Sequence, residues 1–313
     1  MTLPMVVPAR DLPASVRIHE VGARDGLQNE KAVVPTEIKA EFIHRLAQAG
    51  LTTIEATSFV HPKWVPQLAD AERLFPMLDG LQGVALPVLV PNERGLDRAL
   101  ALGADRIAVF ASATESFAKA NLNRTVDESL QMFAPVVARA KEQGGHVRGY
   151  LSMCFGDPWE GAVPVHQVVR VAKSLMDLGC DELSLGDTIG VATPAHVRSL
   201  LAALNEEGVP TSAIGVHFHD TYGQALSNTF AALQHGVRTV DASAGGLGGC
   251  PYAKSATGNL ATEDLVWMLQ GLGVDTGVDL GRLTATSVWL AEQLGRPSPS
   301  RTVRALSPDS HKE

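Results

Sequence analysis

A pair of histidines in an apolar strand is the first feature of this sequence that could do chemistry. The segment "IGVHFHD" (214–220) reads as a buried β-strand, because its other positions are mostly apolar. His217 and His219 are two residues apart, so both side chains point to the same face of the strand. One such histidine could be a satisfied polar core residue, but two near the end of a strand favour a metal or catalytic site.

Other polar residues also follow or interrupt apolar runs. Arg24 and Asp25 lie in "GARDGLQNE" (22–30), directly after the first expected strand, and Glu55 lies inside "TIEATSF". An unpaired carboxylate in a buried strand would be costly. We therefore expect Glu55 to pair with Arg24 or with another cation.

The segment "GGLGGCPYAKSATGN" (245–259) follows the last expected strand. Four glycines in its first five positions predict a mobile loop of the kind that closes over a substrate, with Cys250 at its end. Asn259 stands just before a helix whose first turn holds Glu263, so it is either a helix cap or a metal ligand. A plain Gly-rich connector does not explain the cysteine.

These residues define a candidate ligand set. Two neutral imidazoles, one carboxylate and one amide oxygen form a mixed nitrogen and oxygen set that suits Mg²⁺ or Mn²⁺ better than a structural Zn²⁺. We predict that Asp25, His217, His219 and Asn259 bind the metal.

The elements that must position these residues recur along the chain. Short β-branched runs alternate with helical segments, and a glycine follows the end of each helix. Eight such units predict a closed (β/α)8 barrel, with its active site at the C-terminal ends of the strands. An open doubly wound sheet is the alternative, but no G-x-G-x-x-G follows the first strand. The expected strands are 16–21, 52–57, 84–90, 106–111, 147–153, 182–186, 214–219 and 239–243.

The barrel is expected to form the main domain, from residue 16 to residue 285. Residues 1–15 read as an irregular N-terminal arm with three prolines, and 286–313 as a short helical tail with a frayed end. The 313 residues exceed an average domain length, but a single α/β barrel often occupies about 250 residues or more, so we expect no second domain.

Composition excludes several classes of partner. The net charge is −8 and no run of Lys and Arg stands out, so nucleic acid is not an expected partner. No stretch of about 18 apolar residues appears, so we expect no membrane span. Three cysteines without regular spacing argue against a disulfide framework and favour a reducing cytoplasm.

Five motifs in order resemble one known family. These are "VGARDGLQNE", "IEATSFVHPKWVPQ", "LGDTIGVATP", "HFHDTYGQALSN" and "GGLGGCPYAKSATGNLATEDLV". They closely resemble the 3-hydroxy-3-methylglutaryl-CoA lyases, a branch of the metal-dependent DRE-type barrels, from about residue 16 to residue 285. One departure is Asp157, which stands where these lyases commonly carry a cysteine. Cys154 is also displaced by one position, and we assign it no catalytic or redox role.

The resemblance implies a reaction and roles for named residues. The reaction is the cleavage of (S)-3-hydroxy-3-methylglutaryl-CoA to acetoacetate and acetyl-CoA, as in leucine degradation, by an enzyme that is commonly a dimer. Arg24 would stabilise the thioester enolate, with Glu55 holding it in place. Asp25, His217 and Cys250 are the candidates for proton transfer, in an order that the sequence does not give. Three further residues have supporting roles: Glu263 beside the metal cluster, Thr188 at the substrate carboxylate and Lys31 at coenzyme A.

Four other functions remain open at this point. The nearest is the same lyase chemistry on a longer isoprenoid-derived hydroxyglutaryl-CoA or on citramalyl-CoA. A condensing synthase is less favoured, because synthases of this kind typically carry a G-E-R-x-G-N segment and a long C-terminal extension. A barrel metallohydrolase usually has its H-x-H on the first strand rather than the seventh. The last is a protein that binds acyl-CoA without turnover.

Overall fold

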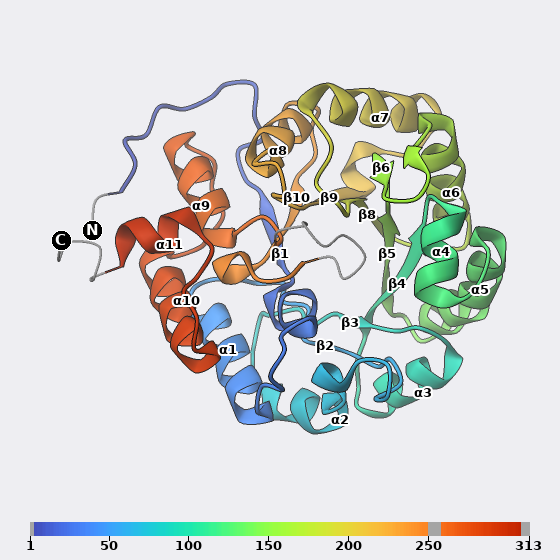
Figure 1. Ribbon diagram of the computed structural model, residues 1–313, viewed down its shortest axis with the longest axis horizontal. Helices are drawn as coiled ribbons and strands as arrows, with labels where there is room; N and C mark the ends of the chain where they lie inside the picture. Colours follow the sequence, from blue (N-terminus) through green and yellow to red (C-terminus); the bar gives the residue numbers. More distant parts are fainter. Residues whose placement is uncertain (1–2, 250–257, 308–313) are drawn as a thin grey trace.

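Eight parallel strands form a closed barrel in the computed structural model, which describes residues 3–249 and 258–307 (Figure 1). Their order around the sheet is β1-β10-β9-β8-β5-β4-β3-β2. The ring closes where Glu20 bridges Ile54 in parallel, with the Glu20 N–H donating to the Thr53 carbonyl at 3.0 Å and the Glu55 N–H donating to the Glu20 carbonyl at 2.8 Å. The predicted (β/α)8 barrel is confirmed.

Each strand of the barrel falls on or directly beside a segment expected from the sequence. β2 and β3 are the shortest, and Pro87 beside them has no N–H to donate to a neighbouring strand. An antiparallel hairpin, β6 (Gly156–Asp157) and β7 (Gly161–Ala162), follows β5. The barrel strands are β1 (Arg17–Glu20), β2 (Thr57–Ser58), β3 (Val88–Leu89), β4 (Arg106–Ser112), β5 (His146–Ser152), β8 (Glu182–Asp187), β9 (Ile214–Phe218) and β10 (Thr239–Ala242).

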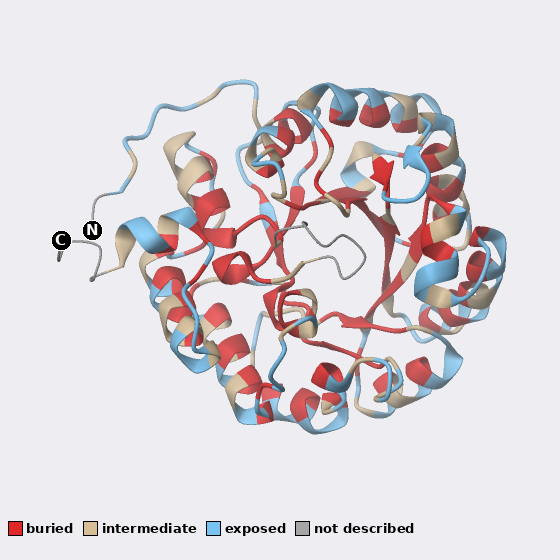
Figure 2. Cartoon of the chain, viewed as in Figure 1, coloured by how far each residue is buried: buried red, intermediate tan, exposed pale blue. Residues whose placement is uncertain are grey.

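Helices cover the outside of the barrel, with their exposed faces turned to solvent and their buried faces turned to the strands (Figure 2). None of the described helices is long and apolar enough to cross a membrane. They are α1 (Thr36–Gln48), α2 (Ala71–Leu74), α3 (Glu93–Ala101), α4 (Glu115–Leu122), α5 (Val126–Glu142), α6 (Val165–Asp177), α7 (Pro194–Glu206), α8 (Ala225–Gln234), α9 (Thr262–Gly271), α10 (Leu280–Leu294) and α11 (Arg301–Leu306).

Local sequence signals set the ends of several helices. A capping box starts α5, where the Thr125 hydroxyl accepts from the Glu128 N–H and the Glu128 carboxylate accepts from the Thr125 N–H. After α1, Gly50 has φ +98°, and a Cβ there would lie 2.2 Å from the carbonyl oxygen of Gly277. Only glycine fits this close approach between the end of α1 and the chain before α10.

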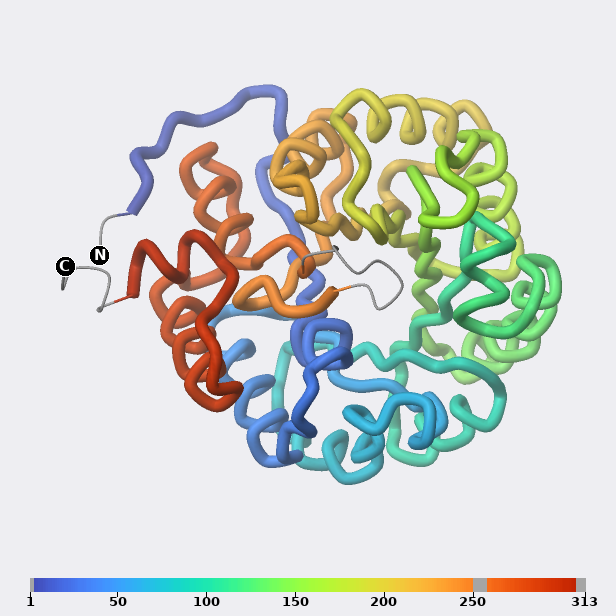
Figure 3. Tube along the Cα trace, in the orientation of Figure 1, coloured from blue at the N-terminus to red at the C-terminus, as the bar shows by residue number. Residues whose placement is uncertain are grey.

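Both described ends of the chain pack on the same side of the barrel. The arm before β1 runs beside α9 (Figure 3), where the N–H groups of Val7 and Ala9 donate to the carbonyls of Gly271 and Leu272. α10 continues across residue 285, so the boundary that we expected there falls inside a helix. The division into arm, barrel and tail stays a prediction.

The barrel interior contains charged groups as well as apolar side chains. Arg148 on β5 is almost fully buried and donates to Glu182 of β8 at 2.7 Å and to Asp241 of β10. The same guanidinium nitrogen that donates to Glu182, Nη1, lies 3.1 Å from Nδ1 of His19 on β1. These contacts link four strands below the mouth of the barrel, and they leave each buried charge with a partner.

Candidate active site

The turn after β1 carries two of the expected site residues. It is a short π-helical turn, η1 (Gly22–Gly26), which is held by the buried carboxylate of Glu20. Glu20 Oε1 accepts from the N–H of Gly22 and from the N–H of Ala244, both at 2.8 Å. Glu20 therefore joins the turn that holds Arg24 and Asp25 to the backbone that follows β10.

Arg24 and Glu55 form the ion pair that we expected. Arg24 Nη2 lies 2.8 Å from Glu55 Oε2, and Arg24 Nη1 lies 2.8 Å from Asp25 Oδ1. The Tyr150 hydroxyl also donates to Glu55 Oε2, at 2.9 Å, and the guanidinium lies 5.4 Å from the centroid of the Tyr150 ring. Burial alone would lower the pKa of Arg24, but Glu55 and Asp25 raise it above its usual value. The side chain is a fixed positive charge at the barrel mouth.

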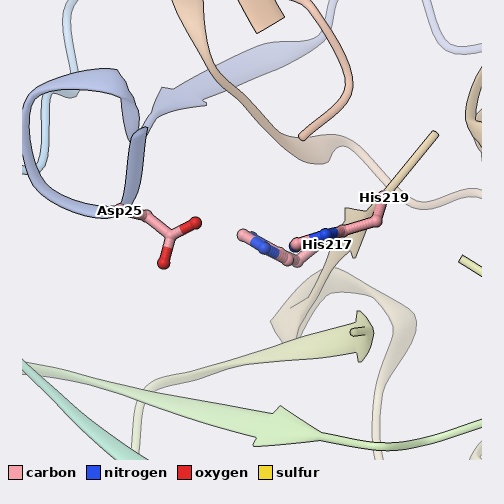
Figure 4. A group of neighbouring side chains, drawn as sticks. All are labelled: Asp25, His217 and His219. Atoms are coloured by element: carbon pink, nitrogen blue, oxygen red, sulfur yellow. The ribbon is translucent and has the colours of Figure 1, made fainter. Parts of the chain in front are cut away.

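Asp25, His217 and His219 lie together and could bind a cation. One ligand atom from each of the three lies within 4.8 Å of the others. Figure 4 shows the Asp25 carboxylate, from the turn after β1, facing the two imidazoles from the end of β9. Burial would raise the pKa of Asp25, but Arg24 and the two histidines lower it, so the carboxylate is ionised. The prediction that the histidines share a face toward this acid is confirmed in its geometry.

Asn259 is held beside this group through its amide nitrogen. Nδ2 donates to Asp25 Oδ2 at 2.8 Å and to the Leu247 carbonyl at 3.0 Å. Oδ1 is buried and accepts from no donor within residues 3–249 and 258–307. A buried amide oxygen beside a carboxylate and two imidazoles suits a hard divalent cation. Asn259 is not the cap of α9, because that helix begins three residues later with Ala261 in the cap position.

Asp241 fixes the orientation of His217. Its Oδ2 lies 3.2 Å from His217 Nδ1, and it also accepts from the Ser184 hydroxyl at 2.8 Å. Burial would raise the pKa of Asp241, but Arg148 and His217 hold it far below its usual value. An ionised carboxylate can only accept, so Nδ1 of His217 carries the hydrogen and Nε2 is left to bind a ligand.

The remaining expected residues lie at different places. Thr188 lines the same cavity as the histidines, and its Oγ1 accepts from the Met153 N–H at 2.9 Å. Lys31 is exposed and does not line the cavity. Cys250 lies outside the described residues. Gly249, just before it, lines the cavity and its carbonyl accepts from the Asn29 amide at 2.8 Å.

Glu263 does not lie in the cavity lining. It is fully buried behind the turn after β10, where its carboxylate accepts from the Gly245 N–H at 2.9 Å and from the Ser287 hydroxyl. Its contact with the cation site is therefore indirect, through the backbone that leads to Leu247. Burial raises the pKa of Glu263 to about 8.

This raised pKa predicts a pH dependence of stability. The pKa of Glu263 is higher in the folded chain than its ordinary value of 4.5, so the folded state binds the proton more tightly. The resulting stabilisation is complete below about pH 4.5 and is lost as the pH rises through 8. Glu263→Gln keeps an acceptor for Gly245 and gives Ser287 a donor. The free energy of unfolding of this variant should fall less between about pH 5 and pH 8 than that of the wild type.

Urea unfolding at both pH values measures this difference. Glu292→Gln, an exposed position on α10, is the matched control. Its free energy of unfolding should change between the two pH values as much as that of the wild type. If Glu263→Gln and the wild type lose the same free energy of unfolding between these pH values, the raised pKa of Glu263 does not contribute to stability.

Two residues at or beside the hairpin after β5 have structural roles. Asp157 accepts from the Thr114 hydroxyl at 2.6 Å and from the N–H groups of Trp159 and Glu160. This explains an aspartate at the position where the resemblance predicts a cysteine. Cys154 is buried and donates to the Leu151 carbonyl, and burial raises the pKa of its thiol well above the usual value.

Asp187 is the last residue of β8, at the C-terminal end of that strand. It is buried and accepts from the N–H groups of Val191 and Ala192, both at 3.0 Å, so it orders the turn after β8.

Sequence reasoning missed the buried residues that support the site. His19, Glu20, Arg148, Tyr150 and Asp241 all lie in strands that we read as apolar. The available signal was the presence of a charged or polar residue inside each of these short runs. Period-two alternation would have placed Arg148 and Tyr150 on one face, but nothing in a single sequence pairs Arg148 with Asp241.

The candidate cation site opens into one large cavity of about 830 Å³. Arg24, Asp25, His217 and His219 lie at one part of its lining. It extends past Tyr150 and Thr188 to residues far from these groups in sequence. The remaining lining includes His61, Trp64, Asn92, Phe117, Asn121, Arg124 and Met132.

The fold and the site define a (β/α)8-barrel protein with a candidate divalent-cation site and a buried arginine at the C-terminal mouth of the barrel. The HMGL-like family model matches residues 15–289, and the chain belongs to the HMGL-like family. The chain is 52% identical over 299 residues to "Hydroxymethylglutaryl-CoA lyase, mitochondrial" of Arabidopsis thaliana. The match covers 96% of this chain and 64% of that relative, so the chain spans less than two thirds of its length.

Two solved structures share the fold over nearly their whole length. The hydroxymethylglutaryl-CoA lyase from Pseudomonas aeruginosa aligns with a TM-score of 0.92 and 45% identity, covering 95% of this chain and 98% of that one. An HMG-CoA lyase from Acinetobacter baumannii, in complex with coenzyme A and 3-methylmalate, aligns with a TM-score of 0.89 and 34% identity, covering 96% and 97%.

Proposed function

We propose that this protein is a carbon–carbon lyase that cleaves (S)-3-hydroxy-3-methylglutaryl-CoA to acetoacetate and acetyl-CoA. One observation carries the proposal: a cation-binding group of one carboxylate and two imidazoles lies in the same cavity as a buried, permanently charged arginine. Membership of the HMGL-like family and the similarity to lyases of this name support it.

The reaction requires three changes of charge. The tertiary hydroxyl loses its proton as the carbon–carbon bond breaks, negative charge develops on the thioester oxygen, and the enolate is protonated. Arg24 meets the second need, because a donor aimed at the developing oxyanion lowers the barrier. Its Nε is buried and has no acceptor within the described residues, so the side chain keeps a donor beyond its two ion pairs. Glu55 holds the guanidinium in place.

A divalent cation fits the remaining polar atoms. Asp25, His217, His219 and Asn259 would hold Mg²⁺ or Mn²⁺, and the buried Asn259 Oδ1 is the observation that supports the fourth ligand. When bound, such an ion lowers the pKa of a hydroxyl group and polarises oxygen atoms.

Three residues are candidates for the proton transfers of the reaction. Each oxygen of Asp25 accepts one hydrogen bond, from Arg24 and from Asn259, and a proton on either oxygen would neutralise the charge that pairs with Arg24. His217 offers only Nε2 to the cavity, because Asp241 binds Nδ1. It can therefore bind a cation or move a proton through that nitrogen, but not both at once. Cys250 is the third candidate.

Two other residues complete the proposed site. The Thr188 hydroxyl accepts from the Met153 N–H and keeps its own hydrogen to donate to the carboxylate of the substrate. Glu263 supports the turn after β10. Lys31 is proposed to contact the coenzyme A part of the substrate, at the edge of the protein rather than in the cavity.

Activity on a set of thioesters tests the proposal. Acetoacetate and acetyl-CoA should form from the methyl substrate with a higher kcat/KM than from citramalyl-CoA or a longer isoprenoid-derived hydroxyglutaryl-CoA. Pocket walls discriminate by only about 1–3 kcal/mol per methylene, so a difference of about 10–200-fold is expected. Negligible cleavage of the methyl substrate by folded protein, with cleavage of a longer one, would move the assignment to that substrate. Release of free CoA from acetyl-CoA and a 2-keto acid would indicate a synthase.

We also propose the cellular setting that this chemistry implies. The reaction belongs to leucine degradation, and the protein is proposed to act as a homodimer in the cytoplasm. Cys154 and Cys180 are free thiols, which fits a reducing compartment. Sedimentation of the purified protein measures the oligomeric state.

A further inference from the structure

An exposed tryptophan lies at the cavity that contains the candidate cation site. The side chain of Trp64 is 82% exposed, yet it lines the cavity. Among the phenylalanines, tyrosines and tryptophans of the described residues, it alone both lines this cavity and is exposed. A large aromatic surface left in water is costly, and at a cavity mouth it indicates a ligand with a flat apolar face.

The loop that carries Trp64 is held firmly. The Trp64 N–H donates to the His61 carbonyl at 2.9 Å. Gln67, three residues on, is buried: its Oε1 accepts from the Val34 N–H and its Nε2 donates to the Ala32 carbonyl, both at 2.9 Å. A ring presented by a fixed loop loses little freedom when it binds a ligand.

Gln67 also connects the Trp64 loop to a second loop that carries an exposed lysine. It ties the loop that contains Lys63 and Trp64 to the loop that contains Lys31, and both lysines are exposed. Arg124, from the turn between α4 and α5, is exposed and lines the same cavity. An aromatic ring with lysines on its own and the adjoining loop suits a ligand that combines a flat base with phosphates.

We propose that Trp64 binds the adenine ring of the acyl-CoA substrate by stacking. The inference rests on the proposed function, since it takes coenzyme A as the carrier of the acyl group. The thioester end would lie at Arg24 and the cation site, and the adenine end would lie at the edge of the cavity against the indole. The phosphates between them would lie near the exposed lysines. Trp64 thereby selects coenzyme A over carriers that lack the nucleotide.

Binding of coenzyme A without turnover tests this inference. The dissociation constants of coenzyme A and of 4′-phosphopantetheine, which keeps a phosphate but lacks the adenosine, are measured for the wild type, Trp64→Ala and Trp64→Phe. Base stacking on an aromatic side chain predicts that Trp64→Ala weakens the binding of coenzyme A by roughly tenfold or more. Trp64→Phe should weaken it by less. The affinity for 4′-phosphopantetheine should change far less. Trp159→Ala, at a half-exposed tryptophan outside the cavity lining, is the matched control.

Quenching of tryptophan fluorescence by coenzyme A is a second, independent measurement. Coenzyme A should quench the emission of the wild type and of Trp159→Phe, and this quenching should be lost in Trp64→Phe. The inference would be overturned if Trp64→Ala weakened the binding of coenzyme A and of 4′-phosphopantetheine equally, or weakened the binding of neither. If the wild type cleaves no 3-hydroxy-3-methylglutaryl-CoA, the proposed function fails, while the comparison of dissociation constants still decides the role of Trp64.

Discussion

Replacing Arg24 by lysine is expected to lower kcat by about 10²–10³, which is the usual effect of removing one donor from an oxyanion site. The guanidinium reaches Asp25 and Glu55 with two different nitrogens and keeps Nε for a third acceptor. A lysine ammonium is a single point charge and cannot keep this planar arrangement. The charge is retained, so the variant separates geometry from charge.

Single-turnover and steady-state rates on 3-hydroxy-3-methylglutaryl-CoA measure the effect, with the affinity for Mn²⁺ measured on the same sample. The loss of a buried ion pair can cost about 3–5 kcal/mol of stability, so thermal unfolding must show that the variant is folded. Arg98→Lys, at an arginine whose carboxylate partner Glu72 lies on the outside of the barrel, is the control. An Arg24→Lys variant that is folded and keeps the wild-type kcat would contradict the role of Arg24.

Replacing Asp241 by asparagine is expected to weaken divalent-cation binding and activity by about 10–100-fold. The carboxylate accepts the Nδ1 hydrogen of His217 and leaves Nε2 free to bind. An asparagine amide can donate to Nδ1 instead, which favours the tautomer with the hydrogen on Nε2. That tautomer cannot bind a cation through Nε2.

Mn²⁺ binding followed by electron paramagnetic resonance reports this directly. Asp241 also binds Arg148 and Ser184, so unfolding must be measured in parallel. Asp181→Asn is the matched control, because Asp181, like Asp241, accepts from a cationic side chain, that of Lys141, and lies away from the cavity. If Asp241→Asn loses stability but keeps its Mn²⁺ affinity, Asp241 supports the fold and does not orient His217.

The architecture could be predicted because its signals are local. An expected strand of five to seven residues, a helix and a closing glycine repeat along the chain, and each expected strand lies on or beside an observed one. The spacing of His217 and His219 placed both imidazoles on one face without knowledge of any distant contact. The pairing of Glu55 with Arg24 followed from the cost of burying a carboxylate alone.

The supporting residues could not be predicted because their partners are far apart in the sequence. Arg148 meets His19 and Asp241 only after the barrel closes, across separations of 129 and 93 positions. Asp187 and Glu263 have side chains of the same kind as Asp25, yet both turn to nearby backbone N–H groups instead of the cavity. Residue type alone does not separate these two roles.

Carbon–carbon cleavage is proposed to depend on a cation held by Asp25, His217 and His219. The most direct measurement is acetoacetate release from 3-hydroxy-3-methylglutaryl-CoA by protein treated with EDTA, before and after Mg²⁺ or Mn²⁺ is restored. We expect activity to be lost with EDTA, to return with either ion in the wild type, and to stay lost in His217→Ala. Undiminished release from fully metal-free wild-type protein would contradict the account.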